Sequence, residues 1–475
     1  MTSGGLGGEC MPTLYDDIYF DGNSGFVAGD SVIMDIVLAY CKSMDWTGAL
    51  NNPMFTSNQG TNTTFFINGS VKFIQNMNLN FFGETEFVSD INGNTITSAG
   101  QHFDNMITLQ GDGSWSLLDS MSVNKLVQKE GNFYSNGHSL HVGKFQSNQP
   151  STTLDTLDLF NSNIYVYAAD GRFEILSDVA NLIYTNLDNT NFYYTSLSGT
   201  LSRQLALVLV DTAYVNEVIF DGVTQNLPYS DIVGGNNKVY INQVEMYLTG
   251  WINTTNVVPS PTDMIHISDV KLYGNTNFGG FDGSVGQCYC GDVYVAHRGN
   301  VYQGVYDSVY IGGSGAVSDG HFNVVIMNGV STVSTVAASG SFFQATEIGT
   351  IILREDATIY GEAASNFNPL EVDTIRLFPG KAYEFEQTMT ITQSGWIDAI
   401  GTGSLPIIMR STAPGVQGTI KSLTDSICLN YIFMQDLDTA GTAVFLQEKS
   451  ALIFPITMVG YLKIVVVRSD FQSYF

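Results

Sequence analysis

The sequence has few basic residues and no long apolar stretch. Its 475 residues include 18 Lys and Arg against 45 Asp and Glu, which gives a formal net charge of -27 at pH 7. Nucleic acids would be repelled by such a chain, because their binding proteins neutralise phosphates with Lys and Arg. The longest apolar candidate, Leu205 to Val215, is interrupted by Asp211 and is shorter than the ~18 residues of a transmembrane helix. We therefore expect no nucleic-acid partner and no transmembrane segment.

Helix and leader signals are also missing. We find no convincing amphipathic helix, while Gly, Asn, Ser, Thr and Tyr are abundant and favour strands and turns. The start of the chain, MTSGGLGGEC, lacks the positive charge and the apolar stretch of a secretory signal peptide. We therefore expect either that the protein stays inside the cell or that Met1 is not its native start.

Cysteine is scarce, and the five are Cys10, Cys41, Cys288, Cys290 and Cys428. An odd number leaves at least one thiol unpaired within a monomer, and no cysteines have the spacing of a zinc site. A disulfide between Cys10 and Cys41 would close a loop of about 30 residues and stabilise the fold by roughly 3 kcal/mol. Two free, buried thiols are the alternative, and the sequence does not separate the two.

The chain does contain a recurring pattern of three apolar residues. One apolar residue is followed three positions later by a second and two positions after that by a third, as in ISDVKL (267–272) and VDTIRL (372–377). Successive middle residues are mostly 23 to 26 positions apart, with steps of 16 around Val309. These middle residues are Val218, Val244, Val270, Val293, Val325, Ile351 and Ile375. A period of ~20 to 30 residues, built from short strands and turns, is typical of a solenoid.

We therefore predict an all-β chain that forms a right-handed parallel β-helix, with three short strands and 20 to 26 residues in most coils. Alternation within each strand presents one apolar stripe, which the next coil must cover. The predicted organisation is an N-terminal capping segment at residues 1–60, the β-helix at residues 61–445, and an aberrant tail at residues 446–475.

Several sequence segments resemble those of a known protein family. They are SGGLGGECMPTLYDDIYFDGNSG and YCKSMDWTG near the start, GDGSWSLLDS and GNFYSNGHSLHVGKFQS in the middle, and LPIIMRSTAPG and SICLNYIFMQDLDTAGTAVF near the end. Through residues 3–445 the chain resembles the exported, adhesin-like cell-surface proteins of Bacteroidetes, which are built on right-handed parallel β-helices and associated with type IX secretion. The resemblance implies a secreted protein at the outer cell surface that contacts a glycan or a protein, and it names no ligand.

The chain departs from that family at both ends. The SGGLGGEC phrase usually lies inside a longer chain, so Met1 is expected to be an internal start. After Phe445 the family continues with an Asn-rich turn and a Gly-Trp-aromatic ending, whereas this chain reads LQEKSALIFPITMVGYLKIVVV. Codons for residues 455–463, read one base out of register, can spell such an ending. We therefore predict that the segment from about Gln447 is a frameshift product.

Enzymes also use the parallel β-helix, so catalysis must be sought in the residues themselves. Glycoside hydrolysis needs two carboxylates ~5 to 10 Å apart, and neighbouring coils are ~4.8 Å apart. The aligned repeats place Glu217, Gln243 and Asp269 at one position. An acidic groove is one interpretation, and an outward-facing polar position is the favoured one. The motifs of polygalacturonases, metallohydrolases, serine hydrolases and nucleotide-binding proteins are absent, so we name no catalytic residue.

Calcium is the most plausible cofactor on composition, because carboxylate-rich turns supply oxygen ligands. The candidates are Asp16, Asp17 and Asp21 near the start and Asp436 with Asp438 near the end. Solvated turn carboxylates are the favoured interpretation, so we predict neither a metal site nor a cofactor site.

The tryptophans Trp46, Trp115, Trp251 and Trp396 could form a platform on which sugar rings stack. Trp115 and Trp396 lie in strand-like contexts, and we predict that both pack in the core instead.

These observations favour a non-enzymatic role, in which an exported, rigid β-helix contacts a glycan or another protein. The alternative is a polysaccharide lyase or glycoside hydrolase on the same scaffold, and a weaker one is a viral tail fibre. A groove with converging Asp and Glu or Lys and Arg would favour the enzyme. An outer surface of Asn, Thr and Tyr without clustered charge would favour the non-enzymatic role, in which the β-helix presents this surface to a glycan or protein.

Overall fold

The computed structural model describes residues 11–147, 154–168, 170–176, 183–195, 203–209, 212–221, 229–234, 238–247, 250–256, 265–280, 288–334, 346–361, 370–424, 426–441, 444–447 and 465–466. The chain divides into two compact units. The first comprises Met1–Glu245 and Asn256–Ile265, and the second comprises Met246–Thr255 and His266–Phe475.

The first unit begins with three stacks of parallel strands. One stack contains β1 (Ile18–Tyr19), β4 (Met44–Asp45), β7 (Val71–Lys72), β10 (Asn94–Thr97), β12 (Ser114–Leu117), β14 (Asn132–Tyr134), β16 (Asp155–Asp158) and β19 (Ile183–Asn186). The second contains β2 (Ser31–Met34), β5 (Met54–Ser57) and β8 (Asn78–Asn80). The third contains β3 (Leu38–Cys41), β6 (Thr64–Ile67), β9 (Glu84–Phe87), β11 (His102–Leu109), β13 (Met121–Gln128) and β15 (Leu140–Ser147). Beyond β15 come β17 (Asn163–Val166), β18 (Arg172–Leu176), β20 (Asn191–Tyr194), β21 (Arg203–Val208), β22 (Ala213–Phe220), β23 (Tyr229–Gly234) and β24 (Val239–Met246).

In the second unit most coils consist of one long and one short strand. The long strands are β26 (Ile265–Leu272), β28 (Tyr289–Val295), β30 (Val305–Ile311), β32 (His321–Met327), β34 (Thr346–Leu353), β36 (Leu370–Leu377) and β38 (Thr388–Ile400). The strands between them are β25 (Gly250–Asn256), β27 (Thr276–Gly280), β29 (Gly299–Tyr302), β31 (Gly315–Ser318), β33 (Ser331–Ser334), β35 (Ala357–Tyr360), β37 (Ala382–Glu386), β39 (Ile407–Ser411) and β42 (Ile432–Gln435). The last strands are β40 (Gly418–Ser422), β41 (Ser426–Asn430), β43 (Leu437–Gly441), β44 (Val444–Gln447) and β45 (Val465–Val466).

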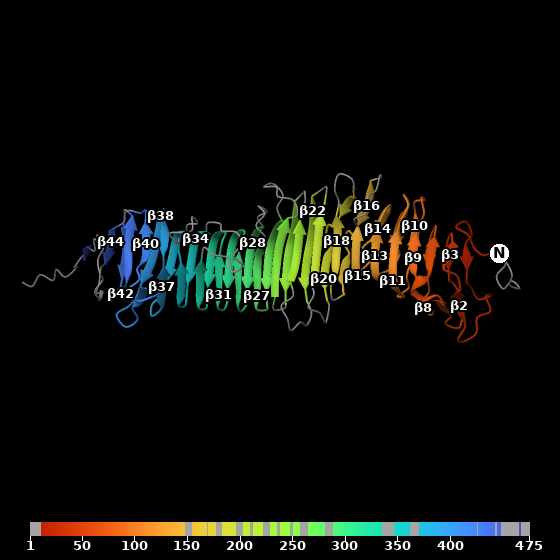
Figure 1. Ribbon diagram of the computed structural model, residues 1–475, viewed down its shortest axis with the longest axis horizontal. Coiled ribbons are helices and arrows are strands. Elements are labelled where there is room, and N and C mark those ends of the chain that lie inside the picture. The colour runs from red at the N-terminus through yellow and green to blue at the C-terminus, as the bar shows by residue number, and fades with distance from the viewer. Residues whose placement is uncertain are drawn as a thin grey trace, which may run out of the picture. The chain divides into compact units, whose positions relative to one another are not determined.

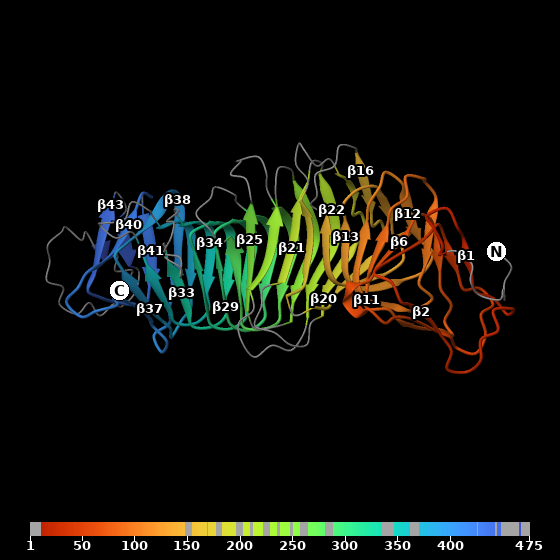
Figure 2. The same cartoon turned by 45° about the vertical axis from the view of Figure 1, so that its right-hand side comes forward.

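Most of these strands pair in parallel with a strand one coil further along the chain. For example, β30 pairs with β28 on one side and with β32 on the other. Figure 1 and Figure 2 show the strands within each unit lying side by side as successive rungs. Among the described residues the one helical element is a single 3-10 turn at Gly60–Asn62, and no described helix is long and apolar enough to cross a bilayer. The prediction of an all-β parallel β-helix is confirmed.

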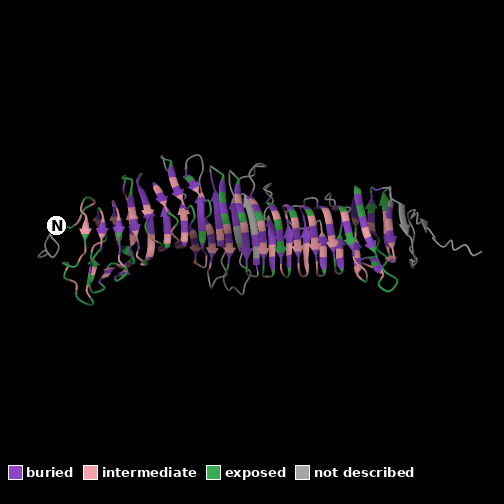
Figure 3. Ribbon diagram, turned by 180° about the vertical axis from the view of Figure 1, so that it is seen from behind, coloured by how far each residue is buried: buried purple, intermediate pink, exposed green. Residues whose placement is uncertain are grey.

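The middle residues of the sequence pattern form a column inside the second unit. Register pairs connect Val270, Val293, Val309, Val325, Ile351 and Ile375 in turn. Each of them exposes at most 2% of its surface, and Figure 3 shows such buried positions recurring from rung to rung. Coil length changes between 16 and 26 residues without disturbing this register. We call this row of buried middle residues the inward column. Its constant register holds successive coils in alignment although their lengths differ.

A bend in each long strand explains the spacing within the pattern. In β34, Ile348, Ile351 and Leu353 are buried, whereas Gly349 and Thr350 are half-buried and face outward. Two consecutive outward residues interrupt the ordinary period of two along a strand. Gly349 has no register partner on β32, while its neighbours pair normally. In the sequence pattern, the step of three residues crosses the bend, and the step of two residues is ordinary strand alternation. One bent long strand therefore takes the place of two of the three short strands that were predicted for each coil, and most coils of the second unit contain two strands.

Glycine permits the shortest coils. Gly299 and Gly315 are in register on β29 and β31. A Cβ atom on Gly315 would lie only 2.0 Å from the carbonyl oxygen of Gly299. The close approach of two backbones at this point therefore requires a residue without a side chain.

The described part of the predicted capping segment is itself wound into coils. Strands β1, β2 and β3 pair in parallel with β4, β5 and β6. Trp46 fills the interior of this end: its ring centroid lies 4.0 Å from that of Phe20 and 5.8 Å from that of Phe55. Aromatic packing thus supplies the core where the coils begin.

Little of the predicted tail is described. The two-residue strand β45 pairs with β44 through Leu446 with Val465 and Gln447 with Val466. Residues 448–464 and 467–475 lie outside the described chain. The frameshift from about Gln447 therefore stays a prediction.

Replacing Ile351 with Ala should destabilise the protein by about 2 to 5 kcal/mol, because it leaves a cavity in the inward column. Ile352→Ala, one residue further along β34 and only half-buried, should cost less, about 1 kcal/mol. Urea unfolding followed by circular dichroism measures both. Equal losses in the two variants would contradict the inward column.

Candidate functional site

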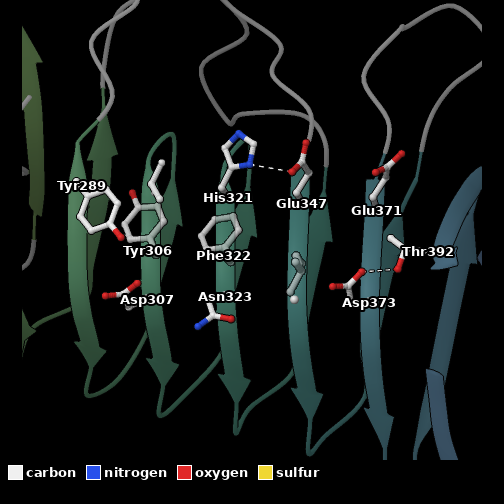
Figure 4. Close-up of a pocket in the computed structure, with 13 residues that line it drawn as sticks. Tyr289, Tyr306, Asp307, His321, Phe322, Asn323, Glu347, Glu371, Asp373 and Thr392 are labelled. Carbon is white, nitrogen blue, oxygen red and sulfur yellow. Dashed lines mark hydrogen bonds and ion pairs between the residues drawn. The ribbon is translucent and has the colours of Figure 1, made fainter. Parts of the chain in front are cut away.

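A groove runs across the outer surface of the second unit. It encloses about 390 Å³ and is lined by residues of six successive long strands, β28 to β38. Figure 4 shows the lining side chains standing on these strands. Because backbone hydrogen bonds hold each strand to the next, the groove is preformed by the scaffold.

Two outward columns supply its polar groups. The first column consists of the residue that directly precedes the first buried residue of each long strand. Register pairs connect its members, which are Tyr289, Val305, His321, Glu347 and Glu371. The second column is the first residue of each bend and contributes Asp307, Asn323, Gly349 and Asp373. Adjacent rungs are ~4.8 Å apart, so members of one column are direct neighbours.

Carboxylates dominate the charge of the groove. Four of its lining residues, Asp307, Glu347, Glu371 and Asp373, are acidic. Neither Lys nor Arg is among the lining residues that the structure describes, and His321 is the one lining side chain that can become cationic. The groove therefore carries a negative potential, which repels anions and attracts cations and hydroxyl donors.

Two of these carboxylates have hydrogen-bond partners inside the groove. Nδ1 of His321 lies 3.0 Å from Oε2 of Glu347, and the hydroxyl of Thr392 donates to Asp373. Figure 4 shows both contacts. Within the described chain, the side chains of Glu371 and Asp307 have no such partner. Their oxygens can accept hydrogen bonds from a ligand.

Aromatic rings support the groove from the core side. The rings of Tyr306 and Phe322 stack with centroids 5.0 Å apart and are almost completely buried. The hydroxyl of Tyr306 donates to the backbone carbonyl of Tyr302 at 2.7 Å, inside the core. Burial raises the pKa of Tyr306 well above its usual value, so this phenol stays neutral. Tyr289, by contrast, is 39% exposed and presents its ring to a ligand.

The residue types suit sugar binding and include those used for sugar cleavage. Unpaired carboxylate oxygens form strong hydrogen bonds with hydroxyl and ammonium groups. Glycoside hydrolysis requires two carboxylates separated by about 5 to 10 Å. Glu347 and Glu371 come from adjacent rungs in register, which brings two carboxylates onto the same wall of the groove.

The carboxylate column predicted from the sequence lies elsewhere. In the first unit, the side-chain amide of Gln243 donates to Glu217 at 3.3 Å and also contacts Glu245. In the second unit, Asp269 is in register with Asp292 and does not line the groove. These residues form outward polar ladders, and none of them contributes to the candidate site.

The first group of calcium candidates is engaged in local contacts. Asp16 accepts hydrogen bonds from the hydroxyl and the backbone N–H of Thr13, at 2.7 and 2.8 Å, which lower the pKa of its carboxyl. Asp17 pairs with Lys42 at 3.3 Å, and Asp21 accepts the N–H of the residue two positions later at 2.8 Å. Each carboxylate thus stabilises a turn or an ion pair.

The second group behaves similarly. Asp436 accepts the N–H of Gly415 at 3.2 Å, and Asp438 accepts the N–H of Thr439 at 2.8 Å. Across the described residues, no group of three or more His, Cys, Asp or Glu side chains is arranged to hold a metal ion.

Cys41 is buried and forms no disulfide with any described cysteine. Burial, with a smaller contribution from the charge of Asp17, raises the pKa of this thiol to about 12. Cys10 lies outside the described residues, so its pairing with Cys41 stays a prediction.

The tryptophans divide into buried and exposed. Trp46 and Trp115 are completely buried, whereas Trp396 is 45% exposed. The prediction that Trp396 packs in the core is wrong, because Ile397 takes the inward position in register with Ile375 and strand alternation turns Trp396 outward. The side chain of Trp251 lies outside the described residues.

Sequence reasoning missed the groove residues, although a signal existed. Glu347 and Glu371 each stand directly before the first apolar residue of a repeat, in IGTIIL and VDTIRL. Aligning those repeats by their apolar residues places the two Glu side chains in one column. The carboxylates predicted from the sequence, Glu217 and Asp269, instead stand two positions after the first apolar residue of their repeats.

Comparisons with known protein families, curated proteins and solved structures gave no match to this chain. The resemblance to Bacteroidetes surface proteins therefore stays a prediction that depends on the quoted phrases.

Acrylamide quenching of tryptophan fluorescence tests the two classes of tryptophan. Trp396→Phe should remove emission that acrylamide quenches readily, because this indole is exposed. Trp115→Phe should remove shielded emission and leave the quenchable part unchanged. Loss of only shielded emission from Trp396→Phe would show that this residue is buried after all.

Proposed function

We propose that this chain is an exported, adhesin-like β-helix whose acidic groove binds a neutral or amino-bearing glycan. The observation that carries the proposal is the row of groove carboxylates, in which Asp307 and Glu371 keep their oxygens unpaired within the described chain. Export is the part of the proposal that rests on the family resemblance alone.

An extended polymer suits the groove better than a compact ligand. Six rungs at ~4.8 Å spacing extend over about 24 Å along the stack. Carboxylate and amide oxygens along this length accept hydrogen bonds from the hydroxyl groups of successive sugars. The exposed ring of Tyr289 at one end adds a face on which a sugar can pack.

The negative charge of the groove disfavours anionic glycans and favours neutral or amino-bearing ones. A uronic acid polymer or a nucleic acid would bring its anions against four carboxylates. A neutral glycan avoids this repulsion, and the ammonium of an amino sugar would gain a charge-assisted hydrogen bond. Lyases act on uronates, so the absence of Lys and Arg from the described lining also disfavours the lyase alternative.

Outer ladders of polar residues support a display role. In the first unit the side-chain amide of Asn191 donates to Asn163 at 2.9 Å, and that of Asn216 donates to Asn191 at 2.7 Å. In the second unit the rings of Tyr294 and Tyr310 stack with centroids 5.1 Å apart. Such rows of like side chains order the outer surface and present it to a partner as a regular array.

Glycoside hydrolysis is the second candidate function. The clustered carboxylates of the groove meet the criterion that the sequence analysis set for an enzyme, and the register pair of Glu347 and Glu371 favours hydrolysis in particular. In that mechanism one carboxyl protonates the leaving oxygen while the other acts as base or nucleophile. His321, hydrogen-bonded to Glu347, would orient that carboxylate. Glu371 would then be the residue free to face the sugar.

A glycan array followed by calorimetry tests binding. The wild-type chain should retain neutral or amino-sugar oligosaccharides and ignore uronates. Glu371→Gln with Asp307→Asn should weaken that binding about 10- to 100-fold, as expected for loss of hydrogen bonds to charged groups. The control Asp269→Asn removes a carboxylate outside the groove and should bind normally. Binding that survives the groove substitutions would refute the groove as the contact site.

Release of reducing ends from the retained oligosaccharide distinguishes adhesion from hydrolysis. An adhesin releases none. A hydrolase releases them steadily, and Glu371→Gln or Glu347→Gln should each slow the release by about 100-fold or more. Turnover that both variants retain would exclude this pair as the catalytic carboxylates.

A further inference from the structure

Cys288 and Cys290 lie together in the interior of the second unit. They expose 2% and 0% of their surface, and their Sγ atoms are 2.9 Å apart. Two unbonded sulfur atoms do not normally approach so closely, whereas a disulfide bond is ~2.05 Å long. We propose that Cys288 and Cys290 form an intrachain disulfide when the protein folds in an oxidising compartment. This inference is independent of what the groove binds.

Strand geometry brings the two sulfurs to the same side. Cys288 immediately precedes β28 and Cys290 is the second residue of that strand, and residues two apart in extended backbone point to the same side. Tyr289, between them, is 39% exposed and faces outward. The Cys-Tyr-Cys sequence therefore points both thiols into the core, and bond formation requires the sulfurs to close from 2.9 Å to ~2.05 Å.

The surroundings of the pair determine when the bond can form. Cys290 is in register with Ile267 on one side and Tyr306 on the other. The hydroxyl of Tyr306 is already bonded to the carbonyl of Tyr302. Burial raises the pKa of the Cys290 thiol well above its usual value. A buried thiol that stays protonated is a poor nucleophile, so the exchange must take place before this coil is closed.

The reaction is a balanced thiol–disulfide exchange. One cysteine thiolate attacks a small-molecule disulfide such as oxidised glutathione and forms a mixed disulfide, releasing one glutathione thiolate. The second cysteine thiolate then attacks the protein sulfur of that mixed disulfide and releases the second glutathione thiolate. The protein loses two S–H bonds and gains one S–S bond, while the oxidant is reduced to two thiols that take up the two protons.

The bond would stabilise the fold only slightly, and its presence would chiefly indicate the compartment in which the protein folded. It encloses a single residue, so it removes little conformational entropy from the unfolded chain. Disulfides persist in extracellular and periplasmic proteins and are reduced in the cytosol. The state of this pair in protein isolated from its source therefore reports on the proposed export.

Peptide mapping of the wild-type chain tests the bond directly. The protein is unfolded in reductant, refolded in mixed reduced and oxidised glutathione, unfolded again with N-ethylmaleimide, and digested with trypsin. The peptide 272–298 contains Cys288 and Cys290 and no other cysteine. We expect it to carry no maleimide and to be lighter by two hydrogen atoms than the reduced peptide.

The other cysteines serve as internal controls. Cys428 lies alone in peptide 422–449 and should be fully alkylated, whereas peptide 1–42 reports separately on Cys10 and Cys41. In the variant Cys290→Ser, Cys288 should become fully alkylated. Two maleimides on peptide 272–298 of the refolded wild type would overturn the proposal. So would a maleimide-free peptide 272–298 that is accounted for by glutathione adducts.

Discussion

Each inward side chain of this protein is covered by the residue one coil further along the chain. Parallel backbone hydrogen bonds hold the rungs at a constant spacing, and the column from Val270 to Ile375 fills the space within them in the second unit. A single coil has no core of its own, because its apolar stripe is buried only by its neighbours. Stability within each unit therefore depends on the match between successive repeats more than on any one contact.

This constraint applies to inward positions and leaves the outward ones free. The outward side chains consequently form ladders of whatever type the sequence supplies, such as the Asn amides from Asn163 to Asn216 or the stacked rings of Tyr294 and Tyr310. Ion pairs follow the same geometry, as where Arg410 meets Glu384 one coil away. In such a fold, the residues that bind or react with other molecules come from the outward columns.

The groove illustrates how such columns become a site. Outward residues of six rungs bring four carboxylates together, although they are spread over residues 307–373 of the chain. Their mutual repulsion is tolerated because the groove is open to water, which screens the charges. A ligand rich in hydroxyl groups can replace that water without adding negative charge. The bend in each long strand contributes to the site, because its first residue, such as Asp373, lines the groove.

The sequence by itself determined the inward half of this structure. The apolar pattern predicted the strands, the coil and the column that includes Val309 after a 16-residue step, because burial imposes the same local spacing on every repeat. The outward half was decided by tertiary structure. Glu371 meets Glu347 only through register across a 24-residue step, and Trp396 faces solvent because Ile397 occupies the inward place. Outward side chains obey no common spacing, so only the stacking of the coils determines which of them become neighbours.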